Sequence, residues 1–169
     1  MEVLITNEQE LVDIKLDFIK EVALEIMKFE GSPENAQLSM VFCDDSAIQD
    51  LNKEYRGKDE PTDVLSFPME LENFVPEIRM LGDIVISMDT AKRQAEEFGH
   101  SVMAEIVILM IHGILHLHGY DHIEEEDCKI MRPREAEILN YLVQTGKFPE
   151  LPVVHSEPLI ERASCDEQQ

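Results

Sequence analysis

The chain carries the segment SVMAEIVILMIHGILHLH at residues 101–118. Apart from Glu105, the three histidines and the serine at its start, its residues are apolar or glycine. A helix that is apolar on almost every side has to be buried on almost every side. We therefore expect a central helix in the interior of the protein. The run from Ile106 to Ile111 is too short to cross a bilayer, so no membrane-spanning segment is expected.

The end of this segment opens a histidine-rich motif, HGILHLHGYDH. His112 and His116 are one helical turn apart, so their side chains project from the same face. Gly119 lets the chain leave the helix, because glycine tolerates a positive φ, and the turn returns His122 toward the same point. Three imidazoles suit one tetrahedral zinc ion and leave a fourth position for water. The motif therefore predicts a catalytic site with one Zn²⁺ per chain, bound by these three histidines.

The spacing of the histidines and the glycine equals that of the metzincin signature H-E-x-x-H-x-x-G-x-x-H. Metzincins place a glutamate, their general base, directly after the first histidine, whereas this chain has Gly113 there. Peptide hydrolysis by the usual route is therefore disfavoured. His118 points roughly opposite to His116 on an ideal helix, so it is not expected to bind the metal. His100 is interpreted as an ordinary residue at a helix start.

Hydrophobic periodicity and helix-end signals predict the remaining elements. Strands are expected at residues 3–6, 37–43, 64–67 and 83–87. One helix is expected to begin at Asn7 through a capping box with Glu10. Others are expected at residues 44–55, 89–98, 101–118 and 124–144. The segment Asp44-Asp45-Ser46 can cap the first of these, which Gly57 ends, and Asp89 opens the next, which Gly99 ends. Pro133 should kink or split the last of these. Helices gather toward the C-terminal half instead of alternating strictly with strands, which favours an α+β class with about five helices.

The length and charge of the chain bound its organisation. We expect residues 1–148 to form one metal-dependent hydrolase domain and residues 149–169, which lack periodicity, to be a disordered acidic tail. The formal net charge is -22. Such a charge favours solubility and opposes non-specific binding to nucleic acid, so an RNA ligand would require a local basic patch.

The cysteines and the N-terminus indicate the compartment. Cys43, Cys128 and Cys165 are odd in number and none lies in a C-x-x-C motif, which is typical of reduced thiols in a cytosolic protein. The first residues, MEVLITNEQE, have acidic residues and no basic region, so no secretory or transit peptide is expected. We expect a cytoplasmic protein with no membrane partner.

The motif HGILHLHGYDH resembles the hallmark of the YbeY family of bacterial endoribonucleases. Glu105 matches the family pattern as well, and the resemblance covers about residues 1–145. Three further segments agree with the family: Arg56 followed by TDVLSFP at Thr62–Pro68, GDIVIS at Gly82–Ser87, and Glu137-Ile138-Leu139. At position 118 the family often has leucine, so His118 is a departure from the pattern.

The resemblance implies a zinc-dependent endoribonuclease that is specific for single-stranded RNA. It implies a role in ribosomal RNA maturation and ribosome quality control in the cytoplasm, with ribosomal RNA as substrate and the ribosomal subunit or assembly proteins as partners. It implies a small mixed β-sheet packed with helices, with the metal in a cleft. By position, His112, His116 and His122 are the implied ligands, and Arg56 matches the family's functional arginine.

Several side chains near these motifs are candidates for catalysis or substrate binding. Arg56 could hold a scissile phosphate with its planar guanidinium, or it could simply be a cation at a helix C-terminus. Asp121 could orient a ligand imidazole or accept a proton, or be a plain turn residue. Glu105 could act behind the metal ligands or be a buried partner for Arg56. Asp63 and Ser66 could line the cleft and bind substrate.

Three hypotheses from different classes follow. The first is a zinc-dependent endoribonuclease that uses Arg56. The second is a metzincin-like zinc peptidase, which Gly113 disfavours. The third is a ribosome-assembly binding factor whose zinc is structural. Cleavage assays on RNA and on casein, each with and without a chelator, would separate the three.

Overall fold

The computed structural model describes residues 1–69, 77–120 and 125–148. Its centre is a four-stranded sheet with the order β1-β2-β4-β3, formed by β1 (Glu2–Asn7), β2 (Ala36–Cys43), β3 (Val64–Pro68) and β4 (Arg79–Ser87). β1, β2 and β4 run parallel, and β3 pairs antiparallel with β4. The sheet is therefore mixed, as expected.

The register between β2 and β4 contains one irregularity, which lies at Gly82. Leu38 pairs with Gly82 whereas the preceding residue, Gln37, pairs with Met80, so the β4 strand carries an extra residue. Gly82 has a φ of +142°, and a Cβ there would lie 2.2 Å from the carbonyl oxygen of Phe67. Only glycine fits at this position, because β3 approaches so closely.

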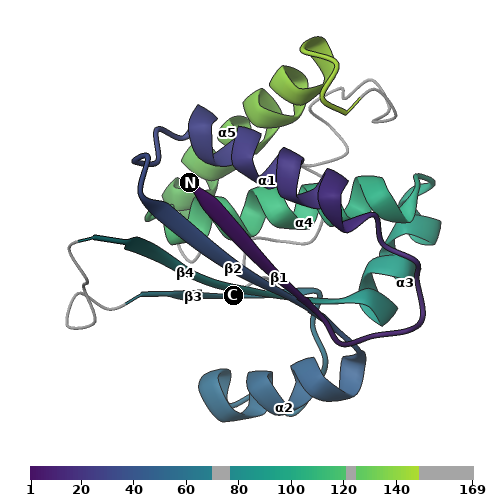
Figure 1. Cartoon of the computed structure of the whole chain (residues 1–169). Helices are drawn as coiled ribbons and strands as arrows, with labels where there is room; N and C mark the ends of the chain where they lie inside the picture. The colour runs from purple at the N-terminus through teal and green to yellow at the C-terminus, as the bar shows by residue number, and fades with distance from the viewer. Residues whose placement is uncertain (70–76, 121–124, 149–169) are drawn as a thin grey trace.

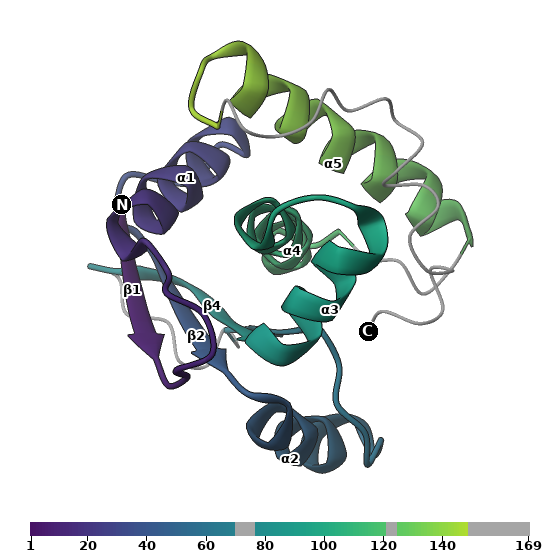
Figure 2. The same cartoon turned by 90° about the vertical axis from the view of Figure 1, so that its right-hand side faces the viewer.

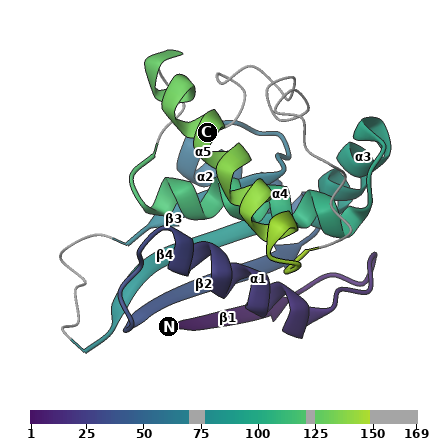
Figure 3. The ribbon, with the colours of Figure 1, turned by 90° about the horizontal axis from the view of Figure 1, so that it is seen from above.

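Five helices of the described residues surround the sheet: α1 (Leu16–Phe29), α2 (Asp45–Arg56), α3 (Met88–Phe98), α4 (Val102–Leu117) and α5 (Glu125–Gln144). α1, α4 and α5 lie over one face of the sheet and α2 lies under the other (Figure 1). Seen from the side in Figure 2, α4 is central, with α1, α5, α3 and the sheet around it. The view from above in Figure 3 shows α1 and α4 lying across the strands. The expected single-domain α+β fold with a mixed sheet and five helices is confirmed.

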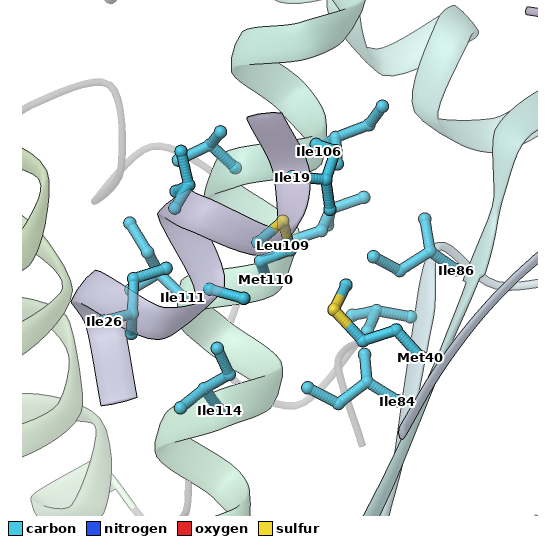
Figure 4. Close-up of a cluster of buried hydrophobic side chains, with 14 of the residues drawn as sticks. Ile19, Ile26, Met40, Ile84, Ile86, Ile106, Leu109, Met110, Ile111 and Ile114 are labelled. Carbon is cyan, nitrogen blue, oxygen red and sulfur yellow. The ribbon is translucent and has the colours of Figure 1, made fainter. Parts of the chain in front are cut away.

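The core lies between α4, α1 and the upper face of the sheet. Eleven of the sixteen residues of α4 are buried, which confirms the predicted central helix. Leu38, Met40 and Phe42 of β2 are completely buried on the same face, as their alternation predicts. Figure 4 shows side chains of α1, α4, β2 and β4 meeting in this layer. Burying one side chain of this size stabilises the folded state by about 1.5–3 kcal/mol relative to leaving it exposed.

Helix ends agree with the sequence signals in most places. The Asp44 side chain accepts a hydrogen bond from the backbone N–H of Ala47 at 2.9 Å and begins α2, and Gly57 ends that helix with a φ of +70°. Ser101 caps α4 in the same way, through the N–H of Ala104. α3 begins one residue before the predicted Asp89, with Ser87 as its N-cap.

The predicted start of the first helix is wrong. Asn7 ends β1 instead of capping a helix, and the next N–H, that of Glu8, still bonds to the carbonyl of Phe42 on β2. The side chain of Gln9 then bonds to both backbone groups of Val12. The side-chain oxygen of Asn7, which a capping box would need, accepts from Nε2 of Gln9 at 2.9 Å, and α1 begins only at Leu16.

The prediction for the last helix is wrong in one of its two alternatives. Pro133 lies inside α5 and does not split it, because the helix continues on both sides from Glu125 to Gln144. The alternative that Pro133 kinks the helix stays a prediction. A proline in a helix removes one hydrogen bond, and the packing of α5 on α4 and α1 compensates for that loss.

Among the described residues, no single helix is long and apolar enough to cross a bilayer. α3 and α4 reach that length and apolar character only when they are taken together, and the chain bends by 111° between them.

Candidate metal and substrate site

Two of the three predicted metal ligands lie together on α4. The ring centroids of His112 and His116 are 4.9 Å apart, with 75° between the ring planes. His112 is buried and His116 is partly exposed. One helical turn therefore brings the two imidazoles to one place, as their spacing predicts.

The His112 ring is fixed by a carboxylate from another helix. Its Nδ1 lies 2.7 Å from Oε1 of Glu135 on α5, and both side chains are almost completely buried. A carboxylate only accepts, so Nδ1 donates, and in a neutral imidazole Nε2 is then the nitrogen that carries the lone pair. Sequence reasoning missed Glu135, because the two partners are 23 positions apart and lie on different helices.

The chain leaves α4 as expected. Gly119 has a φ of +95°, its N–H bonds to the carbonyl of His116, and the N–H of Tyr120 bonds to that of Leu115. These two bonds form a Schellman ending of the helix. The next predicted site residues, Asp121 and His122, lie outside the described residues.

The residue after His112 is packed against the sheet. A Cβ on Gly113 would lie 3.0 Å from Cδ1 of Ile84 and 3.2 Å from Oγ of Ser66. A glutamate at this position would have to push its side chain between α4 and the strands. The structure thus gives a physical reason why the metzincin general base is absent here: the close approach of helix and sheet occupies its place.

Arg56 is connected to the histidines through β3. It is the last residue of α2, and its Nη2 donates to the carbonyl oxygen of Ser66 at 3.4 Å. The hydroxyl of Ser66 in turn donates to the carbonyl of Gly113, also at 3.4 Å. Both bonds are long and therefore weak. They nevertheless place the guanidinium at the strand that packs on α4 beside His112.

The other candidate from the same motif, Asp63, is buried. Its Oδ1 accepts from the N–H of Val64 at 2.7 Å and its Oδ2 from Nε2 of Gln94 at 3.3 Å. Its carbonyl accepts from the N–H of Ser87. These contacts hold the start of β3 against β4 and α3. A role for Asp63 or Ser66 in substrate binding stays a prediction.

Glu105 has a different partner from the one expected. Its carboxylate is completely buried and accepts from Nε2 of His100 at 2.6 Å. The alternative that Glu105 is a buried partner for Arg56 is wrong. His100 directly precedes Ser101, the N-cap of α4, so it does lie at a helix start, and there it pairs with this carboxylate. The pair connects the α3–α4 turn to the first turn of α4, two turns before His112. A catalytic role for Glu105 stays a prediction.

His118 has hydrogen bonds on both ring nitrogens. Nδ1 donates to the carbonyl of Ile114 at 2.9 Å, and Nε2 accepts from the hydroxyl of Ser32 at 2.7 Å. These bonds tie the end of α4 to the turn after α1. They agree with the expectation that His118 is not a ligand.

Cys43, at the end of β2, is a buried free cysteine. Burial, together with the nearby carboxylates of Asp44 and Glu8, raises the pKa of its thiol to about 12. A thiol with so high a pKa is unreactive near neutral pH, because the thiolate is the nucleophile.

The described residues alone do not complete a metal site, since they contain no group of three potential ligands. The donors that they do contain fit a divalent metal. His112 and His116 lie on one helix face, and the carboxylate–imidazole pair of Glu135 and His112 is the arrangement that supports metal-bound histidine in proteins. His122, the third predicted ligand, lies just beyond the described end of this segment.

The described residues define an α+β protein in which a central helix over a mixed sheet carries paired histidines, with an arginine held at the neighbouring strand. Residues 4–143 match the family model described as endoribonuclease YbeY. The chain therefore belongs to the endoribonuclease YbeY family, as its motifs indicate.

Individual relatives agree with this family. The chain is 47% identical over 149 residues to an endoribonuclease YbeY from Pelotomaculum thermopropionicum, covering 84% of this chain and 97% of that protein. It is 44% identical to one from Bacillus mycoides, covering 80% and 91%. A solution structure from Thermotoga maritima has a TM-score of 0.58 and 26% identity, covering 86% of this chain and 91% of that one.

Proposed function

We propose that this protein is a zinc-dependent endoribonuclease that cleaves single-stranded RNA in ribosomal RNA maturation and ribosome quality control in the cytoplasm. The observation that carries the proposal is the connection from Arg56 through Ser66 to Gly113, directly beside His112. It links a cation suited to phosphate, through β3, to the helix that carries a pair of imidazoles suited to a metal. The proposed partners are ribosomal RNA and the ribosomal subunit or its assembly proteins.

In this proposal His112, His116 and His122 bind the metal, with Glu135 behind His112. A zinc ion bound there supplies a Lewis acid and makes water more acidic. Asp121, next to His122, is proposed to orient that imidazole or to accept a proton.

Arg56 is proposed to bind the scissile phosphate. Its planar guanidinium can donate two parallel N–H bonds to phosphate oxygens, and these bonds strengthen as negative charge develops during cleavage. The 3.4 Å contact to Ser66 is weak enough to be exchanged for phosphate when substrate arrives. Ser66 and Asp63 then hold β3, and through it the arginine, at the correct distance from α4.

We propose that Glu105 has a structural role and does not contact the substrate. Its carboxylate has no exposure to solvent and is bonded to His100. A group so placed cannot reach a phosphate, but it can hold α4, and with it both histidines, in position.

Specificity for single strands is supported by Tyr55, the residue before Arg56. Its side chain is 60% exposed although it is large and aromatic, and its ring packs against Phe67 at 5.1 Å. Exposed aromatic rings next to a phosphate-binding cation are places where unpaired bases stack. Bases in a duplex are already stacked and paired, so they cannot use such a ring.

The alternatives make different predictions. A metzincin-like peptidase needs a general base where Gly113 leaves no room. A binding factor with a structural zinc needs no cleavage at all. The net charge of -22 opposes non-specific binding to RNA, so both the nuclease and the binding factor require a local basic patch where RNA binds.

One experiment separates these functions. Protein with zinc, with a chelator, and with zinc restored is incubated with a defined single-stranded RNA, with the same RNA as a duplex, and with casein. We expect cleavage of the single strand only, lost with the chelator and recovered with zinc. Casein cleavage that follows the metal would favour the peptidase. RNA binding without cleavage would favour the binding factor.

A further inference from the structure

We infer that Glu135 is a positioning residue that sets the orientation and tautomer of His112 and so strengthens metal binding at this site. The inference rests on the metal site in the proposed function. Nothing in the sequence motif points to it, because Glu135 lies on α5, 23 residues from His112.

The geometry of the pair supports this role. Nδ1 of His112 and Oε1 of Glu135 are 2.7 Å apart, a short distance typical of a hydrogen bond to a charged acceptor. The two side chains are only 10% and 11% exposed, so water competes little for this bond. With Nδ1 as donor, the neutral ring presents Nε2 as its lone-pair nitrogen, which is the form that a metal requires.

The carboxylate is itself held in place. The neighbouring Arg134 donates to Glu30, the C-cap residue of α1, at 2.6 Å, and its guanidinium lies 4.6 Å from the centre of the Phe29 ring. A second contact lies further along α5, where the hydroxyl of Tyr141 donates to Glu25 of α1. These contacts fix α5 against α1, and both helices pack on α4, so the Glu135 carboxylate is positioned before a metal arrives.

The chain offers a matched control in Glu137. This residue lies two positions later on the same helix, but its side chain is 59% exposed and it contacts Arg134 instead of a histidine. Glu137→Gln removes the same charge from the same helix without touching His112. Any effect of Glu135→Gln that Glu137→Gln does not share therefore comes from the contact with His112.

The test uses the full chain and two readouts besides activity. Zn²⁺ affinity is measured by competition with a chromophoric chelator, and the tautomer of His112 is read from ¹⁵N NMR of the metal-free protein. Glu135→Ala should weaken Zn²⁺ binding about 10–100-fold, and it should lose the Nδ1–H tautomer of His112. Glu135→Gln keeps an acceptor oxygen without the charge and should show a smaller loss, whereas Glu137→Gln should match the wild type.

Each outcome bears on the inference. Glu135→Ala with wild-type affinity and an unchanged tautomer would overturn it while leaving the proposed nuclease function intact. A wild type that binds no Zn²⁺ would overturn both the metal site and the inference. If Glu135→Ala fails to fold, the same comparison between Glu135→Gln and Glu137→Gln decides: equal affinities overturn the inference, and weaker binding by Glu135→Gln alone supports it.

Discussion

Arg56 is the last residue of α2. Its role has two explanations, and they differ in whether a lysine could replace it. A helix-end cation interacts with the last carbonyls through charge alone, so lysine would substitute with little loss. A phosphate-binding guanidinium uses a planar fork that lysine lacks. The contact to Ser66 on β3 favours the second explanation, because it directs the side chain away from the axis of its own helix.

Arg56→Lys should therefore lower the rate of single-turnover RNA cleavage on the order of 10²–10³-fold. Zinc content and melting temperature should stay close to wild type, since among the described residues the side chain makes one hydrogen bond, which is long. RNA binding should remain measurable, because the charge is kept. Cleavage by the mutant at the wild-type rate would show that Arg56 has no special catalytic role.

Gly113 leads to a prediction about stability. Gly113→Glu must force a carboxylate between α4 and the buried side chain of Ile84, which combines overpacking with an unpaired buried charge. We expect a loss of about 3 kcal/mol or more in the free energy of unfolding, measured with urea. Lys92→Glu on the exposed side of α3 is the control and should change stability by less than about 0.5 kcal/mol.

The same mutant also tests the peptidase alternative. Gly113→Glu restores the metzincin sequence at this position. It should not create casein cleavage, because the packing leaves no space for the carboxylate to act. A stable Gly113→Glu protein that gains metal-dependent peptidase activity would contradict this account of the position.

At the scale of elements, α2 and α3 are joined through Asp45. Its carboxylate accepts from the hydroxyls of Ser87 and Thr90, both at 2.6 Å, and from Arg93 at 2.8 Å. Burial raises the pKa of Asp45, but these three hydrogen bonds outweigh it and hold the pKa below the usual 3.8. The charged form of the carboxylate is thus the one that ties the two helices together.

This shift predicts a pH dependence. A carboxylate with a lowered pKa in the folded state stabilises the protein above its unfolded pKa, and that contribution is lost as the pH falls through the folded value. The difference in unfolding free energy between wild type and Asp45→Asn should be largest near neutral pH and shrink below about pH 3.8. Urea unfolding of both proteins from pH 3 to 7 measures it. If the difference in unfolding free energy is constant over this pH range, the pKa of Asp45 is not lowered in the folded protein.

Local signals predicted those elements whose hydrogen bonds are local. The cap at Asp44, the glycine ends of α2 and α3 and the apolar run of α4 are all set within a few residues, and each prediction is confirmed. The start of α1 is set by pairing between β1 and β2, which the sequence near Asn7 does not reveal. Pro133 lies inside α5 because the packing of this helix on α4 and α1 outweighs the low helix propensity of proline.

In the site, too, local contacts could be predicted from the sequence and distant contacts could not. The pairing of His112 with His116 follows from helix geometry and was predicted. Contacts made across the fold, such as Glu135 with His112 and His100 with Glu105, were not. In both cases a buried histidine and a buried carboxylate satisfy each other, and the sequence does not show which of many acids is the partner.

At the scale of the whole molecule, the fold gathers the site around α4. The helix is enclosed by the sheet, α1, α3 and α5 (Figure 2). Ser66 of β3 bonds to Gly113 and also to Arg56 of α2, Glu135 of α5 bonds to His112, and His100 in the turn before α4 bonds to Glu105. The histidines are therefore held by elements from most of the described chain.

The central claim is that the metal bound at the α4 histidines is required to cleave RNA. Its most direct test is single-turnover cleavage of a single-stranded RNA by the wild type and by His116→Ala, with zinc content measured on the same samples. The account predicts about one zinc per chain and chelator-sensitive cleavage for the wild type, and the loss of both in the mutant. Full zinc content and undiminished cleavage in His116→Ala would contradict it.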